Sequence, residues 1–319
     1  MPEPRSGMMQ VQARVRDPEA VLQRLEWRVI RRLDGLLQGD YRTLFRGFGL
    51  DLAEIREYQL HDDVRAIDWN VTARMQTPYV RQFNEDREIT AWFLLDLSPS
   101  VDFGTVQRRK RDSLVDFTSL LARLLTRRGN RVGAIFFNGA VERVVPAHGG
   151  RTQVLRLIND LLGQPRLDHA PATDLSVLLE AACRILRRRS LLFIVSDFIS
   201  LPGWDKPLSV LVQRHEALAV RLYDPREVEL PDVGAVFIED SETGEQLFLD
   251  THDPGFRRRF AEAAGRREHE LQTVFSRAAV DVLALSTEDD LASEILRFAA
   301  VRRQRQILAT SVSARPRLS

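Results

Sequence analysis

In the larger, carboxyl-terminal part of the chain, short apolar runs alternate with longer amphipathic stretches. Residues 89–95 form a nearly continuous apolar run, which is typical of a strand buried on both faces. Strands are also predicted at 131–137, 141–145, 191–195, 217–222 and 280–285, helices at 108–127, 152–162, 175–186, 204–214, 255–276 and 289–302, and a hairpin at 235–249. Strands and helices that alternate at this spacing predict an α/β fold, with a doubly wound, mainly parallel sheet over residues 87–302.

The segments on either side of this domain have different patterns. Residues 1–16 are expected to be disordered, and residues 303–319 to form a frayed tail. A helix is predicted from Asp17 to about Gln38, because Asp17 is a good cap, Pro18 suits a first turn and Gly39 ends the pattern. The helix and the irregular, charged segment that follows it make up residues 17–86.

The charged segment is interpreted as an ordered collar that packs on the main domain, because aromatic residues are interleaved with the charged residues. Two functions are open for its charged side chains: an ion network that pins the collar to the sheet, or a docking surface for a partner. Tyr58 and Trp69 are expected to act as packing anchors. The collar residues singled out in this way are Arg56, Tyr58, Asp63, Arg65, Asp68, Trp69 and Arg74.

Composition excludes several classes of function. The formal net charge of +1 gives no bulk attraction to nucleic acid or to anionic lipid. The single cysteine, Cys183, excludes an internal disulfide and a cysteine-rich zinc site. No apolar stretch is long enough for a membrane span, so a cytoplasmic protein is expected. Only Lys110 and Lys206 are lysines, so nearly all the basic charge is arginine.

Oxygen-bearing side chains follow two of the predicted strands. Asp96, Ser98 and Ser100 follow the first core strand, Asp197 follows the strand at 191–195, and Thr173 precedes a helix. Ligands of doubly wound sheets bind beyond the carboxyl ends of the strands, near the point where the strand order reverses. Carboxylates and hydroxyls suit Mg²⁺, or Mn²⁺ or Ca²⁺ in its place. The alternative is that these residues only cap helices, which does not exclude metal binding.

This pattern resembles the metal-ion-dependent adhesion site of von Willebrand factor A domains. Together with Arg56-Glu57-Tyr58, Asp62-Asp63-x-Arg65-x-Ile67-Asp68-Trp69 and Ala73-Arg74, it resembles the bacterial domain-of-unknown-function family number fifty-eight over roughly residues 47 to 290. Members of that family contain an A-like domain and are commonly encoded beside MoxR-type AAA+ ATPases. Here His61 stands where the family usually has glycine, and the amino-terminal membrane helices of many relatives are not found.

The resemblance implies a non-enzymatic module that binds protein through a metal ion. Its expected partners are a MoxR-type AAA+ ATPase and a client that supplies a carboxylate, with the protein acting as adaptor or co-chaperone. The chain lacks a Gly-x-x-x-x-Gly-Lys-Ser/Thr loop, so ATP hydrolysis would belong to the partner. The alternative function is a metal-dependent phosphohydrolase with Asp96 as nucleophile.

Overall fold

The computed structural model describes residues 17–26, 29, 54–59, 62, 64, 67–82, 89–104, 108–167, 172–239 and 245–313. The segment predicted to be disordered, residues 1–16, lies outside this set. So does nearly all of the predicted first helix beyond residue 26.

The main domain is built on a six-stranded sheet with the order β5-β4-β3-β6-β7-β10. Its strands are β3 (Thr90–Asp96), β4 (Arg131–Phe137), β5 (Val141–His148), β6 (Leu191–Ser196), β7 (Glu216–Tyr223) and β10 (Asp281–Ser286). All neighbours are parallel except the edge strand β5, which runs antiparallel to β4. Numbered along the chain, the order is 3-2-1-4-5-6, which is that of a doubly wound fold whose order reverses between β3 and β6.

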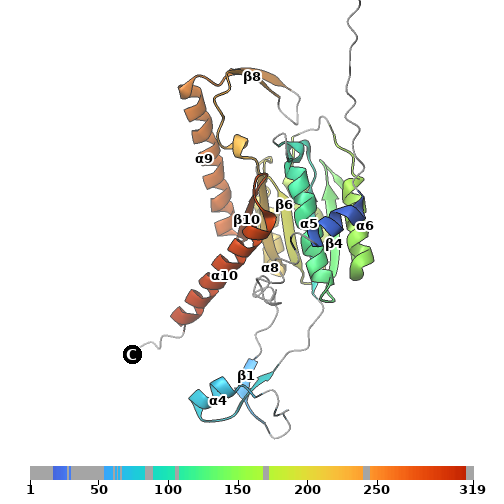
Figure 1. Ribbon diagram of the computed structural model, residues 1–319, viewed down its shortest axis with the longest axis vertical. Helices are drawn as coiled ribbons and strands as arrows, with labels where there is room; N and C mark the ends of the chain where they lie inside the picture. Colours follow the sequence, from blue (N-terminus) through green and yellow to red (C-terminus); the bar gives the residue numbers. More distant parts are fainter. Residues whose placement is uncertain are drawn as a thin grey trace, which may run out of the picture.

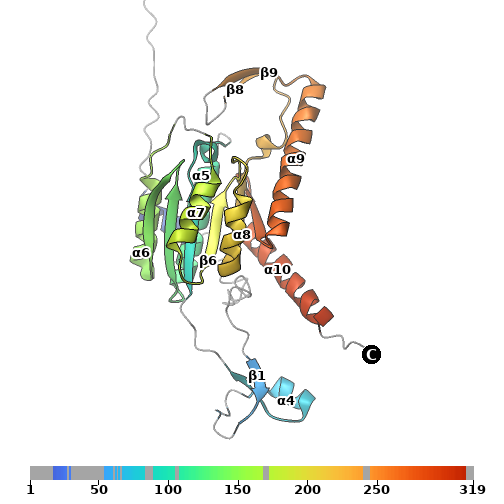
Figure 2. The ribbon, with the colours of Figure 1, turned by 180° about the vertical axis from the view of Figure 1, so that it is seen from behind.

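Helices cover both faces of this sheet (Figures 1 and 2). One face carries α5 (Lys110–Thr126), α6 (Gly150–Leu162) and α10 (Leu291–Ser313), and the other carries α7 (Leu175–Ile185), α8 (Asp205–Arg214) and part of α9 (Pro254–Arg277). The predicted fold class, an α/β fold with a doubly wound and mainly parallel sheet, is therefore confirmed.

The apolar runs form strands because both of their faces are buried. In β3, Phe93 contributes to the core under α5, whereas the next residue, Leu94, contributes to the core under α7. In β6, Phe193 and Ile194 divide in the same way, and the rings of Phe93 and Phe193 stack with their centroids 5.0 Å apart. This two-sided burial holds the carboxyl ends of the neighbouring strands β3 and β6 at fixed positions.

The first helix, α1 (Pro18–Leu25), packs on the main domain. Asp17 caps it, as predicted, by accepting a hydrogen bond from the N–H of Glu19. Its apolar side belongs to the core shared with α5 and α6, and Leu22 is fully buried there. The guanidinium of Arg24 also pairs with Asp116 of α5.

The collar contains regular structure that the hydrophobic pattern did not predict. The strands β1 (Glu54–Glu57) and β2 (Tyr79–Gln82) pair antiparallel, and α4 (Trp69–Met75) lies between them in the chain. Asp68 is buried and accepts a hydrogen bond from the N–H of Val71 at the start of α4. Its position fits the capping of a short helix.

The expectation that Trp69 is a packing anchor is wrong in this structure, because 69% of its surface is exposed. Trp69 is the first residue of the seven-residue helix α4, and a helix of this length on a two-stranded sheet buries only one narrow side. Tyr58 is half-buried and Arg74 is exposed. Asp63, Arg65 and the side chain of Arg56 lie outside the described residues, so the ion network proposed for them stays a prediction.

The carboxyl-terminal third adds a hairpin and a longer final helix. The hairpin, β8 (Ala235–Glu239) and β9 (Gln246–Asp250), agrees with the prediction at 235–249. Helix α10 continues to Ser313, so the predicted boundary at residue 302 is wrong for the segment 303–313. The helical pattern is interrupted after residue 302 by four consecutive polar residues, 303–306, and the apolar residues that follow them are too few to establish a helical spacing.

Candidate functional site

The candidate site lies where β3 and β6 run side by side, at the point where the strand order reverses. The register pairs Leu95 with Val195, so Asp96 and Ser196 are the next residues on the two strands. The hydroxyl of Ser196 donates a hydrogen bond of 2.6 Å to Asp96 Oδ2. Asp197 follows directly, which brings two carboxylates that are far apart in sequence to the same edge of the sheet.

The turn after β3 brings its two serines together. The N–H of Ser98 donates to Asp96 Oδ1 over 3.0 Å, and the hydroxyl oxygens of Ser98 and Ser100 are 3.1 Å apart. All three side chains are buried. Pro99 begins a short 3-10 helix (Pro99–Asp102), which turns the chain so that residues 98 and 100 lie on the same side. The Asp-x-Ser-x-Ser spacing therefore gathers one carboxylate and two hydroxyls, as predicted.

Thr173 lies beside the loop that follows β6. Its carbonyl oxygen accepts a hydrogen bond of 2.8 Å from the N–H of Leu201, and its own side chain is buried. Ser200 strengthens this connection, because its Oγ accepts a hydrogen bond of 2.9 Å from the N–H of Leu175 in α7. The helix cap is the next residue, Asp174, which accepts from the N–H of Ser176 over 2.9 Å. The cap of α7 is therefore Asp174 and not Thr173.

The loop after β6 contains a residue in the left-handed region. Phe198 has a φ of +58°, a conformation that is costly for a residue with a side chain. Its ring is buried and makes an edge contact with Phe275, at a centroid distance of 4.9 Å, and a tilted contact with Trp204. These contacts hold the turn immediately after Asp197 in place.

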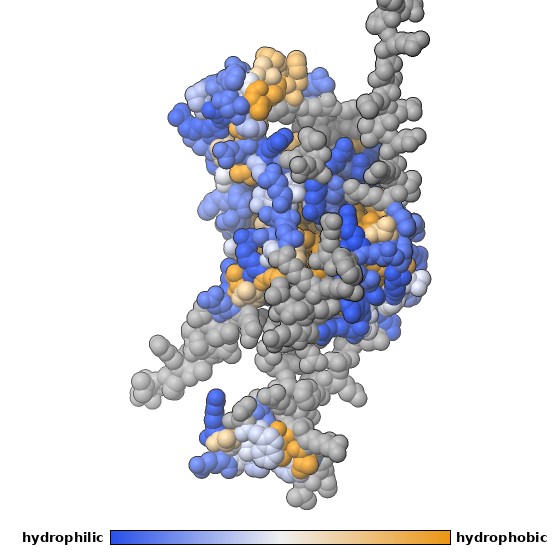
Figure 3. All heavy atoms as spheres, viewed as in Figure 1, coloured by the Kyte–Doolittle hydropathy of each residue, from blue (hydrophilic) through white to orange (hydrophobic). Residues whose placement is uncertain are grey.

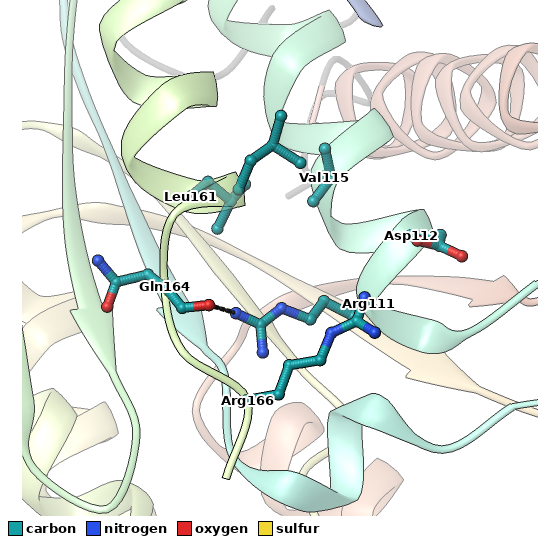
Figure 4. A pocket seen from close by; sticks show the side chains of 7 residues that line it. Arg111, Asp112, Val115, Leu161, Gln164 and Arg166 are labelled. Atoms are coloured by element: carbon teal, nitrogen blue, oxygen red, sulfur yellow. Dashed lines mark hydrogen bonds between the residues drawn. The ribbon is translucent and has the colours of Figure 1, made fainter. Parts of the chain in front are cut away.

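A salt-bridge cluster braces the other side of the Ser98–Ser100 turn. Arg111 of α5 reaches Asp102 over 3.0 Å and donates a second hydrogen bond of 3.0 Å to the carbonyl oxygen of Gln164. Figure 4 shows this second bond and the side chain of Arg166, which pairs with Asp102 over 3.3 Å. The cavity between these groups holds only about 50 Å³, so we assign the cluster to positioning the turn that carries Ser100.

The residue that sequence reasoning missed is Lys110, at the first position of α5. Its side chain is fully buried, and its Nζ lies 2.7 Å from Asp197 Oδ2 and 2.6 Å from Glu227 Oε1. Glu227 belongs to a short 3-10 helix (Pro225–Glu227) after β7. The one available signal was composition, because Lys110 is one of only two lysines in a chain whose other basic residues are arginine.

The electrostatics of the site depend on this burial. Burial raises the pKa of Asp96 from 3.8 to about 6, and the nearby charge of Asp197 adds to this effect, while hydrogen bonds from Ser196 and Ser98 oppose it. Burial would lower the pKa of Lys110, but the carboxylates of Asp197 and Glu227 outweigh it and raise that pKa. The hydrogen bonds to Asp96 therefore do not offset the cost of burying its charge beside Asp197.

The donor set fits a hard divalent cation. Two buried carboxylates, of which Asp197 disfavours the ionisation of Asp96, and a pair of hydroxyls 3.1 Å apart are oxygen ligands of the kind that Mg²⁺ and Ca²⁺ accept. Among the described residues, no group of three or more His, Cys, Asp or Glu side chains is placed to hold a metal. The candidate site differs from such a group, because three of its predicted donors, Ser98, Ser100 and Thr173, are hydroxyls.

The strand order, with helices on both faces of the sheet and one antiparallel edge strand, is that of an α/β domain of the von Willebrand factor A type. The chain belongs to the family described as "Protein of unknown function DUF58", whose model matches residues 54–270. This confirms the family resemblance inferred from the sequence.

Relatives of the chain have been named without a function. "Uncharacterized protein Rv1480" of Mycobacterium tuberculosis is 40% identical over 290 residues, which cover 90% of this chain and 91% of that protein. "Uncharacterized protein MAV169" of Mycobacterium avium is 36% identical over 160 residues, which cover 50% of this chain and 94% of that protein.

A similar solved structure is "conserved hypothetical protein BatB" from Bacteroides thetaiotaomicron. It is 14% identical, covers 70% of this chain and 99% of its own, and has a TM-score of 0.42. An "aerotolerance-related membrane protein" from Bacteroides fragilis is 12% identical, covers 68% of this chain and 99% of its own, and has a TM-score of 0.43. Among the described residues, no helix is both long and apolar enough to cross a bilayer.

Proposed function

We propose that the protein is a non-enzymatic, metal-dependent protein-binding module. In this proposal Asp96, Ser98, Ser100, Thr173 and Asp197 hold Mg²⁺, or Mn²⁺ or Ca²⁺ in its place. A bound ion with so few anionic ligands leaves a position for a carboxylate of the partner. The observation that carries the proposal is the pair of buried carboxylates at the edge between β3 and β6, with the hydroxyls of Ser98 and Ser100 beside them.

The hydrogen bonding of Asp96 supports binding over catalysis. Both of its oxygens already accept hydrogen bonds, one from the Ser98 N–H and one from the Ser196 hydroxyl. Its side chain is fully buried. Each oxygen keeps a second lone pair for a metal ion, and the two hydrogen bonds fix the orientation of the carboxylate as such bonds do for metal ligands. A nucleophile would have to reach its substrate from this buried position.

Exposed apolar side chains at the same end of the molecule support a protein partner. Phe103 and Leu201 follow the two ligand loops and are 39% and 48% exposed. Figure 3 shows a further hydrophobic patch on the β8–β9 hairpin, where Phe237 and Phe248 contact each other while remaining exposed. Exposed apolar patches bordered by polar residues are typical of sites that contact another protein.

We infer that the partners are a MoxR-type AAA+ ATPase and a client protein whose carboxylate reaches the ion. This part of the proposal is supported by membership of the family and by the resemblance described above. The chain would then act as an adaptor or co-chaperone, with the ATPase supplying the energy for remodelling.

The first experiment measures metal binding. Isothermal titration with Mg²⁺ and Mn²⁺ compares the wild type with Asp96→Asn, Asp197→Asn and a matched control, Glu262→Gln, on the exposed surface of α9. We expect binding in the wild type and in the control and at least about a hundredfold weaker binding in both site variants, because each loses one of only two anionic ligands. Equal affinity in all four proteins would refute the assignment.

The second experiment tests the partner. The same four proteins are used as bait in Mg²⁺ and in EDTA, and the captured proteins are identified by mass spectrometry. We expect a client that is held only in Mg²⁺ and only by the wild type and the control, together with a MoxR-type ATPase. Identical captures in Mg²⁺ and EDTA would refute a role of the metal in recognition.

A further inference from the structure

The ammonium of Lys110 neutralises carboxylate charge that a bound cation would otherwise neutralise. It is fully buried and contacts Asp197 Oδ2 at 2.7 Å and Glu227 Oε1 at 2.6 Å, with the ring of Phe103 at 5.7 Å from Nζ. A buried charge is stable only when it is paired. Of its two anionic partners, Asp197 is a predicted metal ligand and Glu227 is not.

This arrangement gives the ammonium two alternative partners. Asp197 Oδ1 accepts a hydrogen bond of 3.0 Å from the N–H of Ile199 and Oδ2 accepts one of 2.7 Å from Lys110, so a metal ion bound to Asp197 would share the charge of one carboxylate with the ammonium. Glu227 is anchored independently, because its Oε2 accepts a hydrogen bond of 3.0 Å from the N–H of Asp224. Glu227 therefore keeps its place whether or not Lys110 contacts Asp197.

We propose that Lys110 is an internal cation that competes with the metal ion for Asp197. Without metal, it neutralises Asp197 and holds it at the site. When a divalent ion binds, Asp197 turns its charge toward the ion and Lys110 remains paired with Glu227. The positive charge of Lys110 opposes the entry of a second cation, so Lys110 keeps metal affinity low until a partner's carboxylate completes the site.

This inference rests on the proposed function, since it concerns the same metal site. A competing role and a purely structural role for Lys110 predict opposite changes in metal affinity when the lysine is removed. A lysine that only supports the fold leaves metal affinity unchanged or weaker when it is removed. A competing cation leaves metal affinity stronger when it is removed, because the repulsion between two cations is lost.

In the experiment, Mn²⁺ is titrated into each protein. Binding is measured by calorimetry and by the loss of the electron paramagnetic resonance signal of free Mn²⁺. Lys110→Met removes the charge and keeps most of the side-chain volume. Glu227→Gln leaves the ammonium with Asp197 as its one charged partner in the cluster. Lys206→Met, at an exposed position of α8, is the matched control for the loss of a lysine.

We expect Lys110→Met to bind Mn²⁺ at least about tenfold more tightly than the wild type, since one unit of nearby positive charge is removed. Glu227→Gln is expected to bind at least about threefold more weakly, and Lys206→Met to bind like the wild type. Binding by Lys110→Met alone, with none by the wild type, would also support the proposal, because it would mean that the ammonium blocks the site.

Unchanged or weaker binding by Lys110→Met, beside normal binding by the wild type, would overturn the role of Lys110 and leave the metal site standing. If neither the wild type nor Lys110→Met binds Mn²⁺, the metal site itself fails as well. Should Lys110→Met not fold, Glu227→Gln decides the matter, because Mn²⁺ affinity equal to or higher than that of the wild type contradicts the competition.

Discussion

The buried carboxyl of Asp96 makes a specific prediction for the metal-free protein. Its pKa is raised from 3.8 to about 6 by burial and by the charge of Asp197. The folded chain therefore holds this proton more tightly than the unfolded chain. The contribution of this proton to the free energy of unfolding is fully present below about pH 4 and is lost as the pH rises through about 6.

The magnitude follows from the size of the shift. Each pKa unit corresponds to about 1.4 kcal/mol, so Asp96 lowers the free energy of unfolding by about 3 kcal/mol between pH 4 and pH 7 when no metal is bound. Asp96→Asn keeps the shape of the side chain and removes its charge. The variant is expected to lose this pH dependence and to gain stability relative to the wild type as the pH rises.

The assay is urea unfolding in EDTA at intervals from pH 4 to pH 7.5, with Glu262→Gln as the control for a lost surface carboxylate. The decisive quantity is the difference between Asp96→Asn and the wild type, because other titrating groups cancel in it. We expect the difference to increase by about 3 kcal/mol in favour of the variant between pH 4 and pH 7. A difference that is constant with pH would refute the electrostatic reasoning.

Three further outcomes are expected. Leu22→Ala, which truncates a fully buried side chain of α1, is expected to lower the free energy of unfolding by about 2–5 kcal/mol in urea, whereas Leu247→Ala on the exposed hairpin changes it by less than about 0.5 kcal/mol. Arg111→Ala releases the turn that carries Ser100, so calorimetry should show severalfold weaker Mg²⁺ binding in a folded protein, with Arg258→Ala on α9 as the unaffected control. A panel of phosphate esters with Mg²⁺ should show no turnover by the wild type, and turnover that disappears in Asp96→Asn would establish the hydrolase alternative instead.

Local periodicity was sufficient to predict the main domain. The strand at residues 89–95 and the helix at 108–127 differ from β3 and α5 by only one or two residues at each end. A strand buried on both faces carries its signal in its own composition, and an amphipathic helix carries it in its spacing. Because these patterns lie within short segments of the chain, they predict the elements without any knowledge of the fold.

The collar and the last helix lacked such signals. The strands β1 and β2 have four residues each, which is too short to establish an alternation, and they stabilise each other across more than twenty residues of sequence. Helix α10 extends to Ser313 through a segment that begins with four consecutive polar residues, 303–306, and has too few apolar residues to establish a helical spacing. In both cases the structure depends on partners that a local pattern does not contain.

At the candidate site, the residue types and their order along the chain were visible before any fold was known. Asp96, Ser98 and Ser100 are neighbours in sequence, so the spacing of the turn alone predicted that their oxygens would meet, as the structure has them. The convergence of Asp197 on Asp96 needed one further assumption, that the strands leading to them are adjacent, and the register of β3 with β6 supplies it.

What the sequence determined by itself is the set of strands, helices and oxygen donors, because each depends on residues close together in the chain. Only the tertiary structure decided that Lys110 and Glu227, which are 117 positions apart, share one buried ammonium beside Asp197. The reason is physical: pairing between buried charges depends on distance in space and on exclusion of water, and neither quantity is written in local sequence.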